Sequence, residues 1–301
     1  MLALVGPTAS GKSELALVIA RRRDSEVVIA DSMQLYRGLP VLTAQPTSRE
    51  MDEVPHHLVG LWALADEGSV GAYAPRAHAA IDSIQSRGAL PLVVGGTGLY
   101  LRAALAELRL PPTVSRDQRE RLEADYEQLG GAAMLARLAD QDPRAAARLH
   151  ANDRRRVVRA LELASVGRSL TPVHDRLWSE AMRVPATIVV LEWPRIVLGE
   201  RIRARARAML RGGAIDEVRE IVRSGVCISK TAARMLGLAQ IMAVCEGRMS
   251  MEACEDEIVL RTRQYARRQE TWARKIPGSI VLAGADGAER NADLLLALAD
   301  V

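Results

Sequence analysis

The sequence of 301 residues predicts an α/β fold, in which a parallel sheet is flanked by helices and an all-helical domain is inserted. Before Pro111-Pro112, short apolar runs typical of buried strands alternate with segments of helical periodicity. From Arg116 to about Arg183 we find only helical periodicity. Thr187 to Glu192 then resumes a buried strand, so chain on both sides of the insertion is expected to complete one sheet.

A strand, a glycine-rich loop and a helix open the chain. The strand is Leu2 to Val5, and the apolar spacing after Lys12 predicts the helix. Val27 to Ala30 is a second buried strand, which ends at Asp31. Because ligands of parallel sheets bind at the carboxyl ends of the strands, the loop and Asp31 are expected at one edge of the sheet.

A helix and a third strand continue the alternation. Tyr73 to Arg87 is predicted to be a helix closed by Gly88, and Leu90 to Val94 is the strand. The strand runs into the turn Gly95 to Gly98, whose glycines allow a ligand to approach the backbone, and a helix from about Leu99 to Leu108 follows.

Further helices and one strand are expected after the insertion. They are helices at Arg195 to Arg211 and Ala214 to Arg223 with a break at Gly212-Gly213, a long helix from about Ser250 to Lys275, a strand at Ser279 to Leu282, and a helix after Asn291. The predicted domains are an α/β core of residues 1–114 and 184–301 around a helical domain of residues 115–183.

Several classes of protein are excluded by the composition. No apolar run approaches the roughly 20 residues that cross a bilayer, and the N-terminus lacks the pattern of a secretory signal peptide. We therefore expect a cytoplasmic protein that does not associate with a membrane. The cysteines, at positions 227, 245 and 254, lack disulfide or zinc spacing and are expected to be buried thiols. The pair His56-His57, in an apparent loop, lacks a third metal ligand.

The net charge of +4 is modest, and lysine occurs only three times among the 41 cationic side chains. Arginine binds phosphate through a planar fork of donors. Composition alone does not indicate nucleic acid, however, and only clustered arginines count as evidence.

The loop Gly6-Pro7-Thr8-Ala9-Ser10-Gly11-Lys12-Ser13 matches GxxxxGK[ST] at every position, between a strand and a helix. Its backbone N–H groups and the helix N-terminus favour anionic oxygens. Lys12 adds a point charge, and the Ser13 hydroxyl can ligate Mg²⁺. The motif therefore predicts a P-loop NTPase-like sheet that binds a diphosphate, without specifying ATP.

Asp31 allows three interpretations on the residues alone. It could bind magnesium in phosphoryl transfer, act as a base toward a nucleophile held near the phosphate, or cap a turn with Ser32.

Longer motifs surround these residues, and through them the chain resembles a known family over essentially its whole length. The motifs are Asp31 to Gly38, Thr43-Ala44, Val54 to Leu58, Val94 to Tyr100, Asn152-Asp153, Arg155 to Glu162, Thr262 to Gln269 and Thr271-Trp272. The family is that of the bacterial tRNA dimethylallyltransferases, or IPP transferases. These enzymes move a five-carbon allylic group from dimethylallyl diphosphate to N6 of the adenosine that follows the anticodon, at position 37.

The resemblance implies a role for each part of the phosphate site. Asp31 is the implied base for the adenine amine, whose lone pair is delocalised into the ring. Thr97 would contact the reacting end of the diphosphate, although a plain helix cap is the alternative. With Mg²⁺, the leaving charge would be held by donors of the loop, namely Thr8, Ser10, Gly11, Lys12 and Ser13.

The resemblance also implies contacts with the tRNA anticodon stem-loop, from which the target base must be extruded. Ser32, Met33, Gln34 and Leu35, beside Asp31, resemble the segment that would hold that base. The implied contacts with the rest of the loop come from Arg119, Arg155, Arg156, Val157, Val158, Arg159, Arg263 and Arg267. For both arginine clusters the alternative is structural: a solvated helix face, or a helix that packs its aromatic residues on the core.

The chain departs from the family pattern at three places. Ala273 and Ala214 stand where the family usually has Phe, which bears on packing, and Gln45 stands where Lys is frequent, which bears on a phosphate contact.

Three other functions compete with this one: prenylation of a free adenine nucleotide, a small-molecule kinase, and a non-enzymatic tRNA-binding protein. A monomer without an obligatory protein partner is expected.

Overall fold

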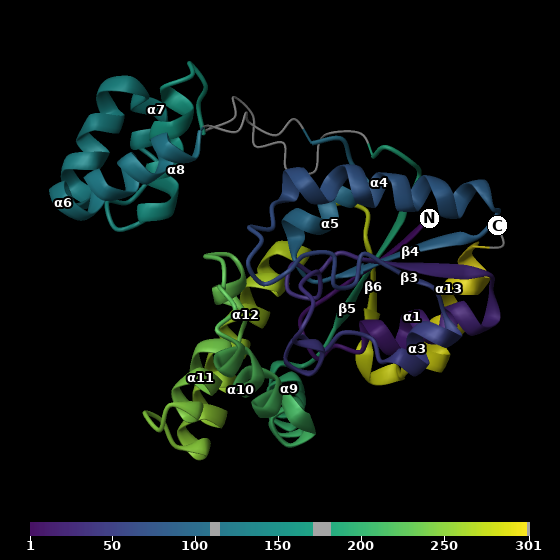
Figure 1. The fold of residues 1–301 in the computed structure, drawn as a ribbon. Helices are drawn as coiled ribbons and strands as arrows, with labels where there is room; N and C mark the ends of the chain where they lie inside the picture. Colours follow the sequence, from purple (N-terminus) through teal and green to yellow (C-terminus); the bar gives the residue numbers. More distant parts are fainter. Residues whose placement is uncertain (109–114, 171–181, 300–301) are drawn as a thin grey trace. The chain divides into compact units, whose positions relative to one another are not determined.

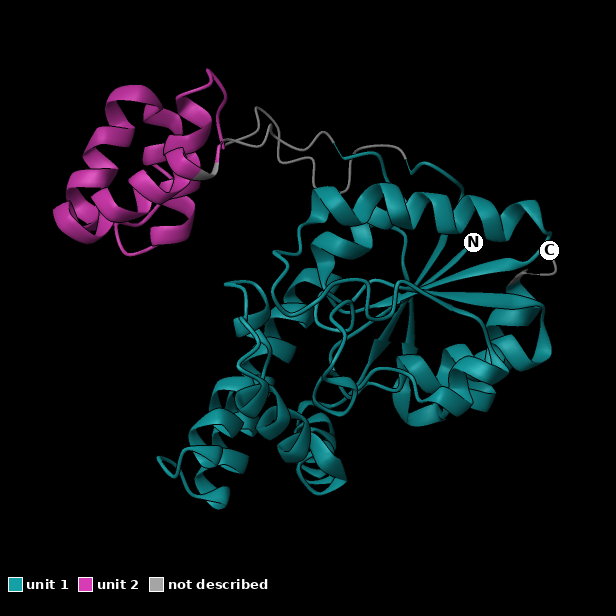
Figure 2. Ribbon diagram, in the orientation of Figure 1, with its two compact units in different colours: residues 1–108, 181–301 teal, residues 109–180 magenta. Residues whose placement is uncertain are grey.

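A computed structural model, which describes residues 1–108, 115–170 and 182–299, divides the chain into two compact units (Figures 1 and 2). One unit comprises Met1–Leu108 and Ala181–Val301, and the other comprises Arg109–Glu180. The first contains the sheet, and the described part of the second contains helices.

The α/β unit is built on one parallel sheet of six strands in the order β3-β2-β4-β1-β5-β6. The strands are β1 (Leu2–Val5), β2 (Ser25–Ile29), β3 (His56–His57), β4 (Leu90–Gly95), β5 (Thr187–Glu192) and β6 (Ile280–Ala283). In the centre, Leu4 of β1 pairs with Val94 of β4 on one side and Val189 of β5 on the other. The predicted parallel sheet is confirmed, including the strand that follows the insertion.

Helices cover both faces of this sheet, which is why its central strands are almost continuously apolar (Figure 1). On one face, α4 (Val70–Ser86) packs beside α5 (Gly98–Leu105). On the other, α1 (Lys12–Arg22) packs beside α13 (Ala288–Ala299). The four residues of β1 are all buried, so the strand that precedes the phosphate loop is fixed on both faces.

The remaining helices of this unit include two elements that later position the phosphate loop, α9 and α12. The bounds are α2 (Pro40–Thr43), α3 (Ser48–Glu53), α9 (Arg195–Met209), a π-helical turn η1 (Leu210–Ala214), α10 (Ile215–Ser224), the 3₁₀ turns η2 (Ala232–Arg234) and η3 (Gly284–Asp286), α11 (Leu238–Cys245) and α12 (Met251–Ala273). The break expected between α9 and α10 is present, because Gly213 adopts a φ of 111° inside η1.

The helical unit consists of α6 (Arg116–Gln141), α7 (Pro143–Ala146) and α8 (Arg154–Ala164) among its described residues. Non-helical backbone at Gly130 (φ 79°, ψ 161°) divides α6. The small hydrophobic core of the helical unit includes Met134, Leu138 and Leu161.

Two smaller expectations are wrong. His56-His57 does not lie in a loop but forms β3, the edge strand paired with β2. The three cysteines are not all buried: Cys254 is buried, Cys245 is partly exposed and Cys227 is exposed.

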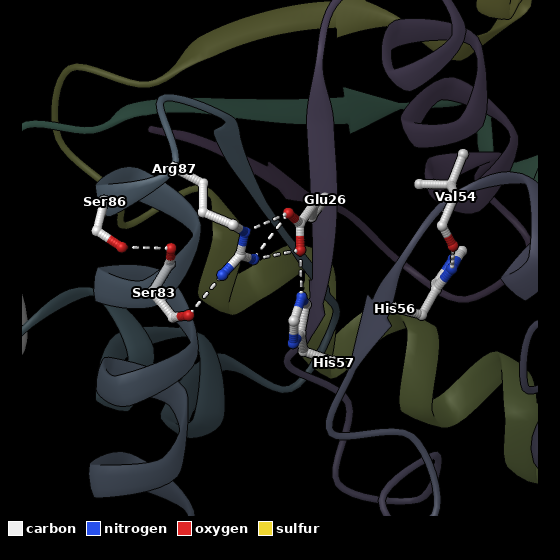
Figure 3. A network of polar contacts seen from close by, with 7 residues as sticks. All are labelled: Glu26, Val54, His56, His57, Ser83, Ser86 and Arg87. Atoms are coloured by element: carbon white, nitrogen blue, oxygen red, sulfur yellow. Dashed lines mark hydrogen bonds and ion pairs between the residues drawn. The ribbon is translucent and has the colours of Figure 1, made fainter.

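A polar network ties β2 to α4 and β3 (Figure 3). The carboxylate of Glu26, whose side chain is 11% exposed, accepts hydrogen bonds from Arg87 Nη2 at 2.8 and 2.9 Å. His57 Nε2 lies 2.6 Å from the same carboxylate. Burial opposes ionisation of Glu26, but the hydrogen bonds and charges of Arg87 and His57 prevail and lower its pKa below the ordinary value. His57 therefore has a hydrogen-bonding role within the fold.

Replacing Glu26 with Gln is expected to destabilise the protein by about 1–3 kcal/mol, because charge-assisted hydrogen bonds are lost at a buried site. Since the folded pKa of Glu26 is lowered, its contribution is complete above the unfolded value near 4.5 and disappears as pH falls through the folded pKa. Denaturant unfolding should therefore show a gap between wild type and Glu26→Gln at pH 7 that narrows toward pH 3. A gap that is constant with pH would contradict this account.

Candidate active site

The phosphate loop connects β1 to α1 and is held from outside by two side chains of distant sequence. Trp193 Nε1 donates to the Ser10 carbonyl oxygen at 2.9 Å, and Arg201 Nε donates to the Ala9 carbonyl oxygen at 2.8 Å. The Arg201 guanidinium stacks 4.2 Å from the Trp193 ring centre, so the two side chains brace each other. Gly11, at φ 91°, precedes α1 and directs the N-terminus of that helix toward the loop.

A pocket of about 320 Å³ opens beside the loop. Its lining combines loop backbone with basic side chains of α9: Ala9, Ser10, Gly11, Lys12, Ser13, Glu14, Arg201, Ala204 and Arg205. Burial lowers the pKa of Arg205, while the charge of Asp31 opposes that shift. Arg205 was not a predicted site residue. The pocket suits a phosphate-bearing ligand, because backbone N–H groups, a helix N-terminus and cationic side chains converge on it.

Lys12 lies where the motif requires it, at the start of α1. Its ammonium donates to the Pro7 carbonyl oxygen at 2.7 Å and to Ser10 Oγ at 3.3 Å. Burial lowers the pKa of Lys12 to about 8; the charge of Asp31 opposes this shift and that of Arg205 adds to it. Lys12 therefore remains mostly charged at neutral pH but titrates close to it.

Asp31 follows the carboxyl end of β2. One of its oxygens, Oδ1, accepts the Met33 N–H at 3.0 Å, so Asp31 does cap the turn that follows β2. A carboxylate has a second oxygen, and a capping contact does not preclude a chemical role. Asp31 is also the electrostatic centre of the site, because its charge raises the pKa values of Lys12, Arg205 and Tyr265.

Thr97 lies in the turn between β4 and α5, next to Ser32, the residue that follows Asp31. Its Oγ1 is 3.4 Å from both the backbone nitrogen and the hydroxyl of Ser32, and 3.0 Å from the Tyr265 hydroxyl. Although Thr97 occupies the N-cap position of α5, its side chain makes no capping hydrogen bond to the described residues. The alternative of a plain helix cap is therefore wrong, and the hydroxyl faces the site.

A residue that the sequence did not single out, Gln269 of α12, joins the two loops. Its Oε1 accepts the Thr8 N–H at 2.8 Å, and its Nε2 donates to the Gly96 carbonyl oxygen at 3.0 Å. A Cβ on Gly96 would lie 2.2 Å from that Nε2, so only glycine fits this approach. Gln269 is the last residue of the family motif Thr262 to Gln269. Its spacing of four residues from Tyr265 places both on one helix face, and this spacing could have indicated its role from the sequence.

The segment expected to hold the target base is braced by amide side chains. Gln34 Nε2 donates to the Ala44 carbonyl oxygen at 2.7 Å. Gln45 Nε2 donates to the carbonyl oxygens of Gln34 and Tyr36, at 2.8 and 2.6 Å. Gln45 thus fixes the backbone of this segment, which gives it a structural role. Ser32 and Met33 are partly exposed beside Asp31.

The basic stretch of α12 divides its side chains between two faces. Arg263 and Arg267 are exposed, and Arg263 also donates to the Gly199 carbonyl oxygen at 3.3 Å. Tyr265 and Trp272 lie on the other side, where they contact Thr97 and Gly98: a Cβ on Gly98 would lie 2.0 Å from the Trp272 ring. Aromatic packing and outward arginines occur together, as the sequence allowed.

The predicted contact residues of the helical unit fall into two groups. Arg119 Nη2 and Arg159 Nη1 donate to the fully buried carboxylate of Glu162, at 3.1 and 2.7 Å. Burial disfavours the charged form of Glu162, but these arginines prevail and lower its pKa. Arg155 and Arg156 are exposed on α8, with the Arg156 side chain 70% exposed.

The valines of the same helix are in a different environment. Val157 and Val158 are buried in the apolar core of the helical unit, with 0% and 5% exposure. Their side chains position α8, and its exposed arginines follow from that position. None of the helices that the structure describes is both long and apolar enough to cross a membrane.

Comparisons with known proteins agree over most of the chain. A family model described as IPP transferase matches residues 34–276, and one described as isopentenyl transferase matches residues 1–62. The tRNA dimethylallyltransferase of Thermobifida fusca is 41% identical over 282 residues, which is 92% of this chain and 88% of that protein. That of Phenylobacterium zucineum is 43% identical over 272 residues, or 90% and 88% of the two chains.

Solved structures show the same similarity. The tRNA isopentenylpyrophosphate transferase of Bacillus halodurans superimposes with a TM-score of 0.70 at 32% identity, covering 98% of this chain and 95% of that one. A eukaryotic dimethylallyltransferase acting on tRNA gives a TM-score of 0.79 at 25% identity, covering 94% and 73%. These likenesses confirm the P-loop NTPase-like fold predicted from the sequence.

Proposed function

The chain belongs to the IPP transferase family, and from this premise we propose that it transfers the dimethylallyl group of dimethylallyl diphosphate to N6 of adenosine 37 in tRNA, releasing diphosphate. One observation carries the proposal: the phosphate loop and the acidic strand end meet at one site. The charge of Asp31 acts on Lys12, and Ser32, the next residue, contacts Thr97. A carboxylate, a diphosphate cradle and a neutral donor are thereby placed together.

The leaving diphosphate is held by the loop. As the bond between the allylic carbon and the diphosphate oxygen breaks, the carbon becomes cation-like and negative charge grows on the leaving group. The backbone N–H groups of Gly11, Lys12 and Ser13, the ammonium of Lys12 and the guanidinium of Arg205 line the pocket and provide positive charge for it. Thr97, in the β4–α5 turn, supplies a neutral hydrogen bond.

Asp31 removes the proton from the attacking amine. The new bond joins N6 of the adenine to the allylic carbon, and the N6 proton passes to the carboxylate as that bond forms. Oδ1 of Asp31 accepts the Met33 N–H, which holds the carboxylate in place and leaves its other oxygen for the amine. If the protein were instead a kinase, Asp31 would be a magnesium ligand.

Mg²⁺ fits the residues at the loop as a partner of the substrate. The described residues contain no group of three or more His, Cys, Asp or Glu side chains that could hold a metal. The Ser13 hydroxyl would be the protein ligand, which suits an ion that takes few protein ligands. When bound, the ion neutralises charge on the departing diphosphate.

The tRNA anticodon stem-loop is the proposed acceptor. Its extruded base would lie along Ser32, Met33 and Gln34, the braced segment beside Asp31. Arg155 and Arg156 of α8, with Arg263 and Arg267 of α12, would neutralise its phosphates. We expect it to act on this substrate in the cytoplasm, as a monomer and without an obligatory protein partner.

Two arginines of α8 are expected to respond differently to truncation. Arg156→Ala should weaken tRNA binding and lower the salt dependence of log affinity by about one unit, with unchanged stability, because one exposed phosphate contact is lost. Arg159→Ala should destabilise the helical unit by about 1–3 kcal/mol, since Glu162 loses a charged partner at a buried site. Salt-dependent filter binding and thermal unfolding of both variants would test this pair. Equal loss of stability in both would contradict it.

Incorporation of labelled dimethylallyl diphosphate into unmodified tRNA tests the function itself. The wild-type protein is expected to label tRNA at adenosine 37 and to release one diphosphate per transfer. Offering AMP together with tRNA distinguishes a free nucleotide acceptor, and ATP consumption without isoprenoid would indicate a kinase. A folded preparation that labels no tRNA would overturn the proposal.

A further inference from the structure

The Thr97 hydroxyl lies in an unusually complete set of hydrogen-bonding neighbours. It has one proton to donate and two lone pairs to accept with. Its neighbours are the Ser32 N–H and hydroxyl, each at 3.4 Å, and the Tyr265 hydroxyl at 3.0 Å. Which of these groups donate determines where the single proton of Thr97 points.

Gln269 is held in one orientation on the same helix face as Tyr265. The side-chain carbonyl oxygen of Gln269 accepts the Thr8 N–H, and its amide nitrogen donates to the Gly96 carbonyl oxygen. A 180° flip of this amide would place two donors together at Thr8 and two acceptors together at Gly96, so its orientation is fixed. The second proton of that nitrogen is left for a further acceptor, and Tyr265 lies four residues away on the same face of α12. If the Tyr265 oxygen accepts that proton, its own proton is directed to Thr97 Oγ1, 3.0 Å away.

Tyr265 keeps the proton that this arrangement needs. Burial, with the negative charge of Asp31, raises the pKa of Tyr265 to about 12, against the lowering effects of its hydrogen bonds and of Arg268. The phenol is therefore neutral and a donor throughout the physiological range. When Tyr265 donates to Thr97 Oγ1, the Ser32 N–H, 3.4 Å away, is the second and weaker donor to that oxygen.

The proton of Thr97 is then directed outward. Among the hydrogen-bonding neighbours of Thr97 in the described residues, the remaining acceptor is the Ser32 hydroxyl, 3.4 Å away and at the limit of hydrogen-bond distance. A charged phosphate oxygen is a much stronger acceptor than a distant neutral hydroxyl. On this basis we propose that Tyr265, held by Gln269, is a positioning residue that commits the Thr97 hydroxyl to donate to the diphosphate of the substrate. This inference rests on the proposed function.

A double-mutant cycle tests whether Tyr265 acts through Thr97. Tyr265→Phe removes only the phenolic oxygen, and Thr97→Val replaces the hydroxyl by a methyl group of similar size. We expect Thr97→Val to lower kcat by about 10²-fold, as loss of a fixed donor does, and Tyr265→Phe to lower it by about tenfold. The KM for tRNA should change by less than about twofold, since the contact concerns the other substrate.

The decisive result is the double variant. If Tyr265 acts through Thr97, Tyr265→Phe should cause no further loss of kcat in the Thr97→Val background. Multiplying losses, or an unchanged kcat in Tyr265→Phe alone, would overturn the inference. Tyr73→Phe is the matched control, because it deletes another buried hydroxyl, one that donates to the Ile29 carbonyl oxygen at 2.9 Å. It should match the thermal shift of Tyr265→Phe without its effect on kcat.

Calorimetric binding of inorganic diphosphate repeats the cycle without any chemistry. Tyr265→Phe should weaken this binding severalfold in the wild-type background and not at all in the Thr97→Val background. If the wild-type protein transfers no prenyl group, the proposed function fails, yet the diphosphate cycle still decides the role of Tyr265. If the protein does transfer the group and both cycles are additive, the role of Tyr265 alone is rejected.

Discussion

Replacing Asp31 with Ala is expected to lower the rate of tRNA prenylation by about 10³-fold, the range typical of a lost general base. Binding of tRNA should change little, because the exposed arginines that meet its phosphates lie elsewhere on the chain. Single-turnover transfer of labelled dimethylallyl diphosphate measures the first quantity, and filter binding measures the second. The two effects separate chemistry from recognition.

Asp31→Asn is the matched variant for this experiment. The Asn side-chain oxygen can still accept the Met33 N–H, so the turn is kept while the basic carboxylate is lost. We expect Asp31→Asn to be as inactive as Asp31→Ala. A nearly wild-type rate in Asp31→Asn would mean that Asp31 serves only as a turn cap. Retention of every activity by both variants would favour a tRNA-binding protein with no enzymatic function.

Replacing Lys12 with Met is expected to lower kcat/KM for dimethylallyl diphosphate by about 10²–10³-fold, because a fixed charge at the leaving group is lost. The wild-type affinity for inorganic diphosphate should also depend on pH in a defined direction. Burial lowers the pKa of Lys12 to about 8, so the ammonium is charged below that pH and affinity should decline as pH rises through it. Titration calorimetry between pH 6.5 and 9.5 tests the trend.

The Lys12→Met variant provides the control for this pH dependence. If Lys12 causes the decline near pH 8, the variant should bind diphosphate weakly but with little change across that range. Asp31→Asn should move the decline to lower pH, because the negative charge of Asp31 raises the pKa of Lys12. An identical decline in wild type and Lys12→Met would assign it to another group.

Much of the fold could be predicted because its strands are short apolar runs buried on both faces. β1, β2, β4 and β5 are largely buried runs of this kind, and β6 is a short apolar run whose residues are partly or fully exposed. The edge strand β3 is two residues long and carries two histidines, so neither length nor apolar pattern indicates it. The short helices α2, α3 and α11 were missed for a related reason: such segments gain stability from tertiary packing more than from their own periodicity.

The site could be predicted where its chemistry is local in sequence. The phosphate loop is continuous, and Asp31 and Thr97 end strands that the apolar pattern reveals. Gln269, Trp193 and Arg201 could not be found in this way, because they lie far along the chain from the backbone groups they bind. Gln269 is separated from its partner Thr8 by 261 positions, and Trp193 from Ser10 by 183. Only the packing of α12 and of the segment after β5 against the loop brings them there.

That separation sets an order of events during synthesis. Thr8 is made 261 residues before the glutamine that holds it. At about 5–20 residues per second, an interval on the order of 10–50 s passes before Gln269 is even polymerised. Throughout that time the nascent chain carries the complete glycine-rich signature without the helix that aligns it. A protein released early by truncation would keep the signature and lack the alignment, so the enzyme becomes competent only when its carboxyl-terminal portion has been made.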